Sequence, residues 1–155
     1  MIFHFNAIKE KIFSNFSRDT ILVGEEIGKN LGGGEVVFLY GILGAGKTVL
    51  VRGIAQVFGI KSRITSPTFN IFRAYDIPRG GKLYHFDCYR LKKYADLVEL
   101  GWEEILADPS AAVVLEWPEC VADKDVTKLS GKKMILIEIK IRGNERIIAK
   151  IERAG

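Results

Sequence analysis

Residues 41–48, with the sequence GILGAGKT, constrain the fold of this chain more than any other stretch. They satisfy every fixed position of the phosphate-loop pattern G-x-x-x-x-G-K-[ST]. The apolar run at 36–40 just before them predicts a buried strand. After the lysine, apolar residues recur at helical spacing over 49–58, and Gly59 is placed to end that helix. Strand, glycine loop and helix follow one another in the order that a phosphate loop requires.

The fixed residues of this loop suit a triphosphate. Glycine permits a turn whose backbone N–H groups point inward, and the helix that follows presents its positive dipole end to phosphate oxygens. Lys47 is expected to contact the β- and γ-phosphates, and the Thr48 hydroxyl to bind Mg²⁺. We therefore predict a nucleoside triphosphate site. The residues predicted to hold the phosphates are Gly41, Gly44, Ala45, Gly46, Lys47, Thr48 and Val49.

Two acidic side chains follow predicted strands, where phosphate-loop proteins place their functional carboxylates. Asp87 follows the strand predicted at 82–86, and Glu116 follows the strongly apolar strand predicted at 111–115. An apolar strand that ends in an acid is the Walker B pattern. Since such acids bind Mg²⁺ or orient the attacking water, Asp87 and Glu116 join Lys47 as predicted catalytic residues. His85 is expected to be packed or hydrogen-bonded in the fold rather than to bind a metal.

The rest of the chain predicts further elements around this unit. Ser17 or Asp19 is expected to cap a helix that ends at the glycines at 32–34, and another helix is expected over 96–106 with Gly101 as its weak point. Residues 9–16 indicate no definite element. Further strands are predicted at 1–5, 69–77, 82–86, 111–115, 134–141 and 147–151, with turn signals at 78–81 and 143–144. The predicted fold is a single α/β domain over residues 1–155, of the P-loop NTPase type. Its mixed central sheet is flanked by helices, and the ligand lies at the carboxyl ends of the strands.

Residues 65–68, Thr-Ser-Pro-Thr, permit two interpretations. Proline fixes φ and hydroxyl groups bond to nearby backbone, which is typical of an ordinary turn. The same hydroxyls also suit a mobile loop that senses a γ-phosphate or its magnesium ion. Composition alone favours the turn, because such turns are common.

Composition argues against several classes of protein. With 48% hydrophobic and 27% charged residues the chain resembles an ordinary soluble protein, and no apolar run is long enough to span a membrane. The opening residues MIFHF lack the pattern of a secretion signal, so secretion is not expected. Cys88 and Cys120 share no metal-ligand spacing. A reduced, cytoplasmic protein is the simplest interpretation.

The positive charge of the chain is concentrated near its end. The first 120 residues are balanced, whereas residues 121–155 contain nine basic and five acidic side chains. This region suits contact with RNA or with an acidic protein partner. A solvated strand face accounts for it equally well. The basic residues are Lys124, Lys128, Lys132, Lys133, Lys140, Arg142, Arg146, Lys150 and Arg153.

Four motifs in order resemble the TsaE family of bacterial P-loop ATPases, which is required to form threonylcarbamoyladenosine in tRNA. They are GILGAGKT at 41–48, SPTF at 66–69, YHFDCYRL at 84–91 and LEWPE at 115–119. The resemblance extends from about Ser17 to the end of the chain. Ile42 departs from the aspartate that the family often carries there, but this position of the loop is variable.

The resemblance implies specific roles for residues of this chain. It implies that the phosphate loop binds ATP or ADP, that Thr48 and Glu116 bind Mg²⁺, and that Asp87 assists catalysis near the γ-phosphate. Trp117 is implied to lie beside the nucleotide, and Ser17 near it. Residues 66–68 are implied to act as a switch through Ser66 and Thr68, which reverses the preference from composition.

The resemblance also implies a partner. Such a protein binds a TsaB–TsaD heterodimer and resets it between rounds by hydrolysing ATP. Its connection to tRNA is therefore indirect. Direct contact with tRNA through the basic C-terminal region is a second possibility that the resemblance leaves open. The residues themselves support dependence on a partner, because no arginine is identifiable as an internal arginine finger. The arginines near motifs are Arg52, Arg63, Arg73 and Arg90. We therefore expect weak ATPase activity in isolation.

Three other functions are compatible with a phosphate loop. A small-molecule kinase would need an acceptor pocket and an arginine-bearing lid, for which the chain leaves little room. A GTPase would need Asn-Lys-x-Asp after a strand, which the sequence lacks. A binding module without activity would not need Asp87 and Glu116 at strand ends. The kinase is the main alternative.

Overall fold

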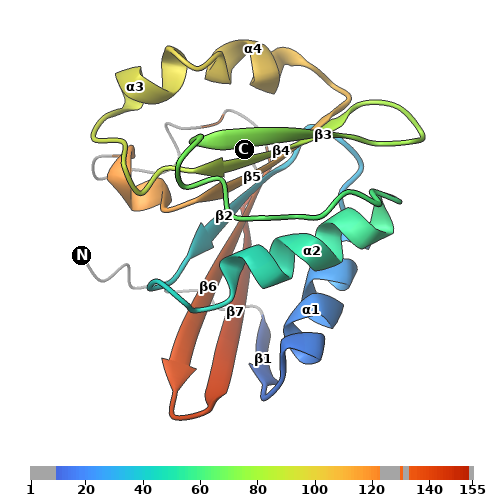
Figure 1. Cartoon of the computed structure of the whole chain (residues 1–155), viewed down its shortest axis with the longest axis vertical. Coiled ribbons are helices and arrows are strands. Elements are labelled where there is room, and N and C mark those ends of the chain that lie inside the picture. The colour runs from blue at the N-terminus through green and yellow to red at the C-terminus, as the bar shows by residue number, and fades with distance from the viewer. Residues whose placement is uncertain (1–9, 123–129, 131–132, 154–155) are drawn as a thin grey trace.

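A mixed seven-stranded sheet organises the chain, with strand order β1-β7-β6-β2-β5-β4-β3 (Figure 1). This is seen in a computed structural model that describes residues 10–122, 130 and 133–153. The strand predicted at 1–5 lies outside the described residues. The strands are β1 (Glu10–Ser14), β2 (Val36–Tyr40), β3 (Phe72–Asp76), β4 (Lys82–Asp87), β5 (Ala111–Glu116), β6 (Met134–Arg142) and β7 (Glu145–Arg153).

Short helices connect these strands. They are α1 (Ser17–Lys29), α2 (Lys47–Val57), α3 (Tyr94–Val98), α4 (Trp102–Ala107) and the 3₁₀ turn η1 (Pro118–Cys120). Within the described ranges, no helix is long and apolar enough to cross a membrane. The predicted α/β fold with a mixed sheet is confirmed.

The centre of the sheet is parallel, and this alignment creates the candidate site. Strand β2 pairs in parallel with β5 and β6, and β4 pairs in parallel with β5. The register matches Leu39 with Glu116, and Glu116 with Asp87. Since parallel strands end at one edge, the loop after Tyr40 and both acids emerge side by side.

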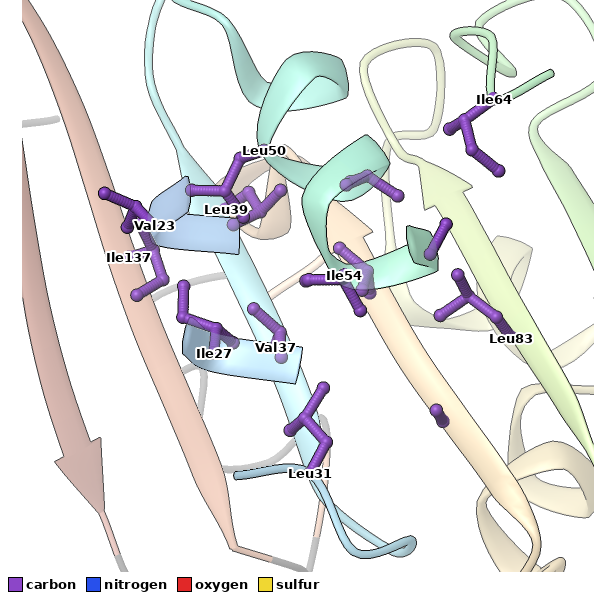
Figure 2. Packing of buried hydrophobic residues seen from close by; sticks show 14 of the residues in the cluster. Val23, Ile27, Leu31, Val37, Leu39, Leu50, Ile54, Ile64, Leu83 and Ile137 are labelled. Atoms are coloured by element: carbon purple, nitrogen blue, oxygen red, sulfur yellow. The ribbon is translucent and has the colours of Figure 1, made fainter. Parts of the chain in front are cut away.

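Helices cover both faces of the sheet, because side chains along each buried strand alternate between two hydrophobic clusters. Val37 and Leu39 face α1 and α2, whereas Val36 and Phe38 face the other cluster, which contains Trp102 of α4. Figure 2 shows the first cluster, in which side chains of both helices meet those of the sheet. Full burial of one such aliphatic side chain contributes roughly 1.5–3 kcal/mol.

Two glycines allow α1 and α2 to pack in direct backbone contact. A Cβ atom on Gly53 would lie 2.1 Å from the Ile21 carbonyl oxygen, and one on Gly24 would lie 2.1 Å from that of Leu50. No side chain fits at either position. This contact places the first turn of α2, and with it the end of the phosphate loop, against α1.

The structure differs from the sequence prediction at several element boundaries. The strand expected at 69–77 begins only at Phe72, because residues 66–71 form a loop in which Ile71 has φ of +68°. The helix expected over 96–106 is two helices, broken where Gly101 takes a left-handed φ of +85°. Residues 10–14, which indicated no element, form β1 by pairing with β7. Even the pair that is closest in sequence, Ser14 with Arg146, is 132 residues apart.

The start of α1 also differs from expectation. Phe16 is its N-cap residue, so neither Ser17 nor Asp19 takes that position. The Asp19 carboxylate instead accepts hydrogen bonds from the backbone N–H groups of Asn15 and Phe16, each at 3.0 Å. Asp19 thus stabilises the entry to the helix from inside its first turn.

We predict that Gly53→Ala separates α1 from α2 and lowers the free energy of unfolding by about 1–3 kcal/mol or more, as overpacking of a tight contact does. Gly32→Ala is the matched control, because the nearest atom to its Cβ is 4.0 Å away on the flexible Glu35 side chain. Urea denaturation measures both. Equal stability of the two variants would contradict the close packing of these helices.

Candidate nucleotide-binding site

The carboxyl edge of the sheet holds a pocket of about 280 Å³ built around residues 41–48. Gly44 and Gly46 have φ of +79° and +104°, a left-handed conformation that only glycine adopts without strain. Helix α2 begins directly after Gly46, so its first N–H groups face the pocket. The pocket is lined by Leu43, Gly44, Ala45, Gly46, Lys47, Thr48, Val49, Ser66, Thr68, Asp87, Glu116, Trp117 and Arg146.

Lys47 is a buried cation whose ammonium group is held by the loop itself. Its Nζ donates to the Gly41 carbonyl at 2.6 Å and to the Ile42 carbonyl at 3.2 Å, and it lies 4.1 Å from the centre of the Trp117 ring. Burial lowers the pKa of Lys47, an effect that the nearby carboxylates partly oppose. The amine therefore stands within the pocket with uncharged carbonyl and ring partners, for which a charged phosphate oxygen could be exchanged.

Glu116 connects the phosphate loop to β4. Its Oε1 accepts a hydrogen bond from Thr48 Oγ1 at 3.3 Å and lies 2.7 Å from His85 Nε2. His85 is fully buried, and its Nδ1 has no hydrogen-bond partner among the described residues. A neutral imidazole that donates from Nε2 to the carboxylate leaves no N–H buried without an acceptor. The predicted structural role of His85 thus agrees with its position, where it orients Glu116.

Asp87 ties the loop at 66–68 to the end of β4. Its Oδ2 accepts hydrogen bonds from Thr68 Oγ1 at 2.7 Å and from Ser66 Oγ at 3.4 Å, and its Oδ1 accepts from the Tyr89 backbone N–H at 3.0 Å. Three hydrogen-bond donors therefore converge on this carboxylate. The segment contains a turn, in which the Asn70 N–H donates to the Pro67 carbonyl at 3.0 Å, and its hydroxyls also lie at the pocket.

Two strained residues flank these acids. Ile71 and Trp117, with φ of +68° and +57°, are the non-glycine residues with positive φ in the described chain. The Ile71 carbonyl accepts the Asp87 N–H at 2.7 Å, and the Trp117 N–H donates to the Leu39 carbonyl at 3.2 Å. Such strain costs about 1–3 kcal/mol at each residue and is concentrated in functional sites and switch segments.

The structure brings together most of the predicted site residues, with two exceptions. Ser17 does not line the pocket, and Gly41 stands behind it, where its carbonyl holds Lys47. Two lining residues were missed. Leu43 occupies a variable position of the loop motif, and Arg146 lies in β7, about a hundred residues after the loop that it contacts. No local sequence signal marks Arg146, because long-range strand pairing positions it.

Comparison with known proteins decides the family. The family described as "Threonylcarbamoyl adenosine biosynthesis protein TsaE" matches residues 14–148. The chain belongs to the TsaE family. The family membership expected from the four motifs is thereby confirmed.

Relatives of the TsaE family support this assignment over most of the chain. A tRNA threonylcarbamoyladenosine biosynthesis protein TsaE from Rickettsia typhi is 33% identical over 90% of this chain and 92% of its own. The protein of that name from Treponema pallidum is 40% identical over 72% of this chain and 80% of its own. The crystal structure of YdiB from Bacillus subtilis superposes with a TM-score of 0.73 at 25% identity, covering 97% of this chain and 89% of YdiB.

We predict that Thr68→Val loosens the 66–70 loop of this TsaE-family protein, because Asp87 loses its shortest hydrogen bond. Amide hydrogen exchange in the loop should accelerate by about tenfold or more, as expected for a bond to a charged group. Thr65→Val is the matched control, since the Thr65 hydroxyl has no partner among the described residues. If both variants exchange at the same rate, Thr68 does not hold the loop.

Proposed function

We propose that this chain is the ATP-binding and ATP-hydrolysing member of the tRNA threonylcarbamoyladenosine pathway that its relatives' names record. One observation carries the proposal: Lys47 and Thr48, at the start of α2, share a pocket with Glu116 and Asp87, at the ends of two adjacent strands. Residues 1–155 would act as one P-loop ATPase domain. The names of the relatives support the assignment to this pathway, and the residues of the pocket support ATP binding and hydrolysis.

The phosphate loop would hold the β- and γ-phosphates. Backbone N–H groups at the start of α2 would donate to phosphate oxygens, and Lys47 would exchange its contacts with the Gly41 and Ile42 carbonyls for phosphate oxygens. Trp117, now 4.1 Å from the amine, would lose this contact as the amine moves. ATP and ADP both fit this arrangement, because both carry a β-phosphate.

The residues present also fit Mg²⁺. Thr48 Oγ1 and Glu116 Oε1 stand 3.3 Å apart, and hydroxyl and carboxylate oxygens are the ligands that Mg²⁺ prefers. No cluster of three or more His, Cys, Asp or Glu side chains suited to a metal occurs in the described part of the chain. This agrees with an ion held by one or two protein oxygens plus phosphate. When bound, Mg²⁺ would offset the negative charge of the β- and γ-phosphate oxygens.

Asp87 would act at the γ-phosphate end of the pocket. Asp87 is only 3% exposed, and its carboxylate would accept a hydrogen bond from the attacking water. The water oxygen would bond to the γ-phosphorus while the bond from that phosphorus to the β–γ bridging oxygen breaks, releasing ADP and phosphate. Ser66 and Thr68, which donate to Asp87, would couple this event to the position of their loop.

Hydrolysis by the isolated protein would be slow and would rise when a TsaB–TsaD heterodimer binds. None of Arg52, Arg63, Arg73 and Arg90 lines the pocket. Large apolar side chains on the surrounding loops are exposed, as at protein interfaces. They are Ile42 at 63%, Leu43 at 82%, Phe69 at 88% and Tyr89 at 55%. A partner on these loops could reach the γ-phosphate. Contact between tRNA and the basic region at residues 121–155 stays a prediction.

ATP turnover tests this function directly. The pure protein should hydrolyse ATP slowly with Mg²⁺, and faster when TsaB–TsaD is added. Lys47→Ala should lower turnover by about 10²–10³-fold, because a donor to the transition state is lost. Lys61→Ala, which removes an exposed lysine in the segment after α2, is the matched control. Glu116→Gln should still bind nucleotide but lose turnover.

Other outcomes would point elsewhere. Brisk turnover by the isolated protein would contradict dependence on a partner. Phosphate transfer to a small acceptor, without a response to TsaB–TsaD, would indicate the small-molecule kinase. Full function in Glu116→Gln would indicate a binding module that uses nucleotide only for stability.

A further inference from the structure

Arg146 reaches the phosphate loop from a distant part of the fold. It is the second residue of β7, paired with Ile141 in β6 and with Ser14 in β1. Tyr40, the last residue of β2, pairs with Glu138, so β6 continues past the end of β2. Figure 1 shows this hairpin extending beyond the segment that joins β2 to α2. Because the β6–β7 hairpin extends past the end of β2, Arg146 lies at the rim of the pocket.

The contacts of Arg146 aim its guanidinium at the loop. Its Nε donates to the Ala45 carbonyl at 3.0 Å, and a Cβ atom on Gly46 would lie 3.4 Å from this Nε. Glycine at 46 therefore leaves room for the arginine. Arg146 also lines the pocket. With Nε committed to Ala45, the terminal nitrogens supply further N–H donors beside the loop.

The sheet order determines which part of a nucleotide Arg146 would meet. Strands β5 and β4, which carry Glu116 and Asp87, lie on one side of β2, and β6 and β7 lie on the other. Under the proposed function, Mg²⁺ at Thr48 and Glu116 places the γ-phosphate on the β5 side. A nucleotide held along the loop then extends its α-phosphate toward β7.

We propose that Arg146 is a nucleotide-binding residue that contacts the α-phosphate, and that it is not an arginine finger for the γ-phosphate. The inference rests on the proposed function for the direction of the nucleotide. The hydrogen bond to Ala45 orients the guanidinium group before ligand binds, and its planar set of donors suits phosphate oxygens. ATP and ADP share the α-phosphate, so Arg146 contributes to binding of both.

Affinity and turnover together test this role. Arg146→Met keeps the length of the side chain but removes its charge and donors. Titration with ADP, and with a non-hydrolysable ATP analogue, should show both affinities reduced by about tenfold or more, the range for a charge-assisted hydrogen bond. The decrease in kcat at saturating ATP should be far smaller. Arg142→Met, which removes an exposed charge from the same hairpin, should bind ADP like the parent protein.

Distinct results overturn the inference. A large loss of kcat with normal ADP affinity would make Arg146 an arginine finger, and normal values of both would make it a structural residue. Failure of the parent protein to bind ADP would overturn the proposed function itself. Arg146→Lys, which keeps the charge, provides a second test if the methionine variant does not fold. In ³¹P NMR of bound ADP, this variant should shift the α-phosphate resonance, and a shift confined to the β-phosphate would contradict the assignment.

Discussion

Parallel pairing of β2, β5 and β4 is the constraint on which the rest of the site depends. It aligns the end of β2 with Glu116 and Asp87, and backbone hydrogen bonds continue the alignment beyond the strands. The Trp117 N–H donates to Leu39, and the Cys88 N–H donates to the Glu116 carbonyl at 3.0 Å. A slip of one residue in either pairing would turn a carboxylate away from the pocket and a hydrophobic side chain into it. The apolar strands that form the core therefore also determine the geometry of the acids.

Charge balance is the second constraint on the pocket. Lys47, buried to 5% exposure, lies near Glu116, Asp87 and Glu119, and burial raises the pKa of Glu119 while it lowers that of Lys47. Three acids face two cations in and around the pocket, Lys47 and Arg146, so a polyphosphate would add negative charge where carboxylates already outnumber the cations. A divalent cation corrects this imbalance. The electrostatics thus favour a nucleotide that arrives together with Mg²⁺, in agreement with the oxygens at Thr48 and Glu116.

The sequence predicted the parts of this protein that local patterns encode. The phosphate loop, its flanking strand and helix, and the acids at strand ends all lie within short stretches whose hydrophobic spacing defines the element. Pairings between distant segments were not predictable in this way. Strand β1 has a weak pattern of its own and is stabilised by β7, and Arg146 reaches the pocket only because β6 extends past β2. Gly101 was recognised as a weak point, but the local pattern does not show that it takes a positive φ and separates α3 from α4.

A crystal structure of the protein with ADP and Mg²⁺ would test the central claim most directly. The β-phosphate is expected within residues 44–48, with Lys47 Nζ moved from the Gly41 carbonyl to a phosphate oxygen. Mg²⁺ is expected to bind Thr48 Oγ1 and Glu116, on the side of the loop that faces β5. A nucleotide bound away from this loop, or Mg²⁺ held without Thr48 and Glu116, would contradict it.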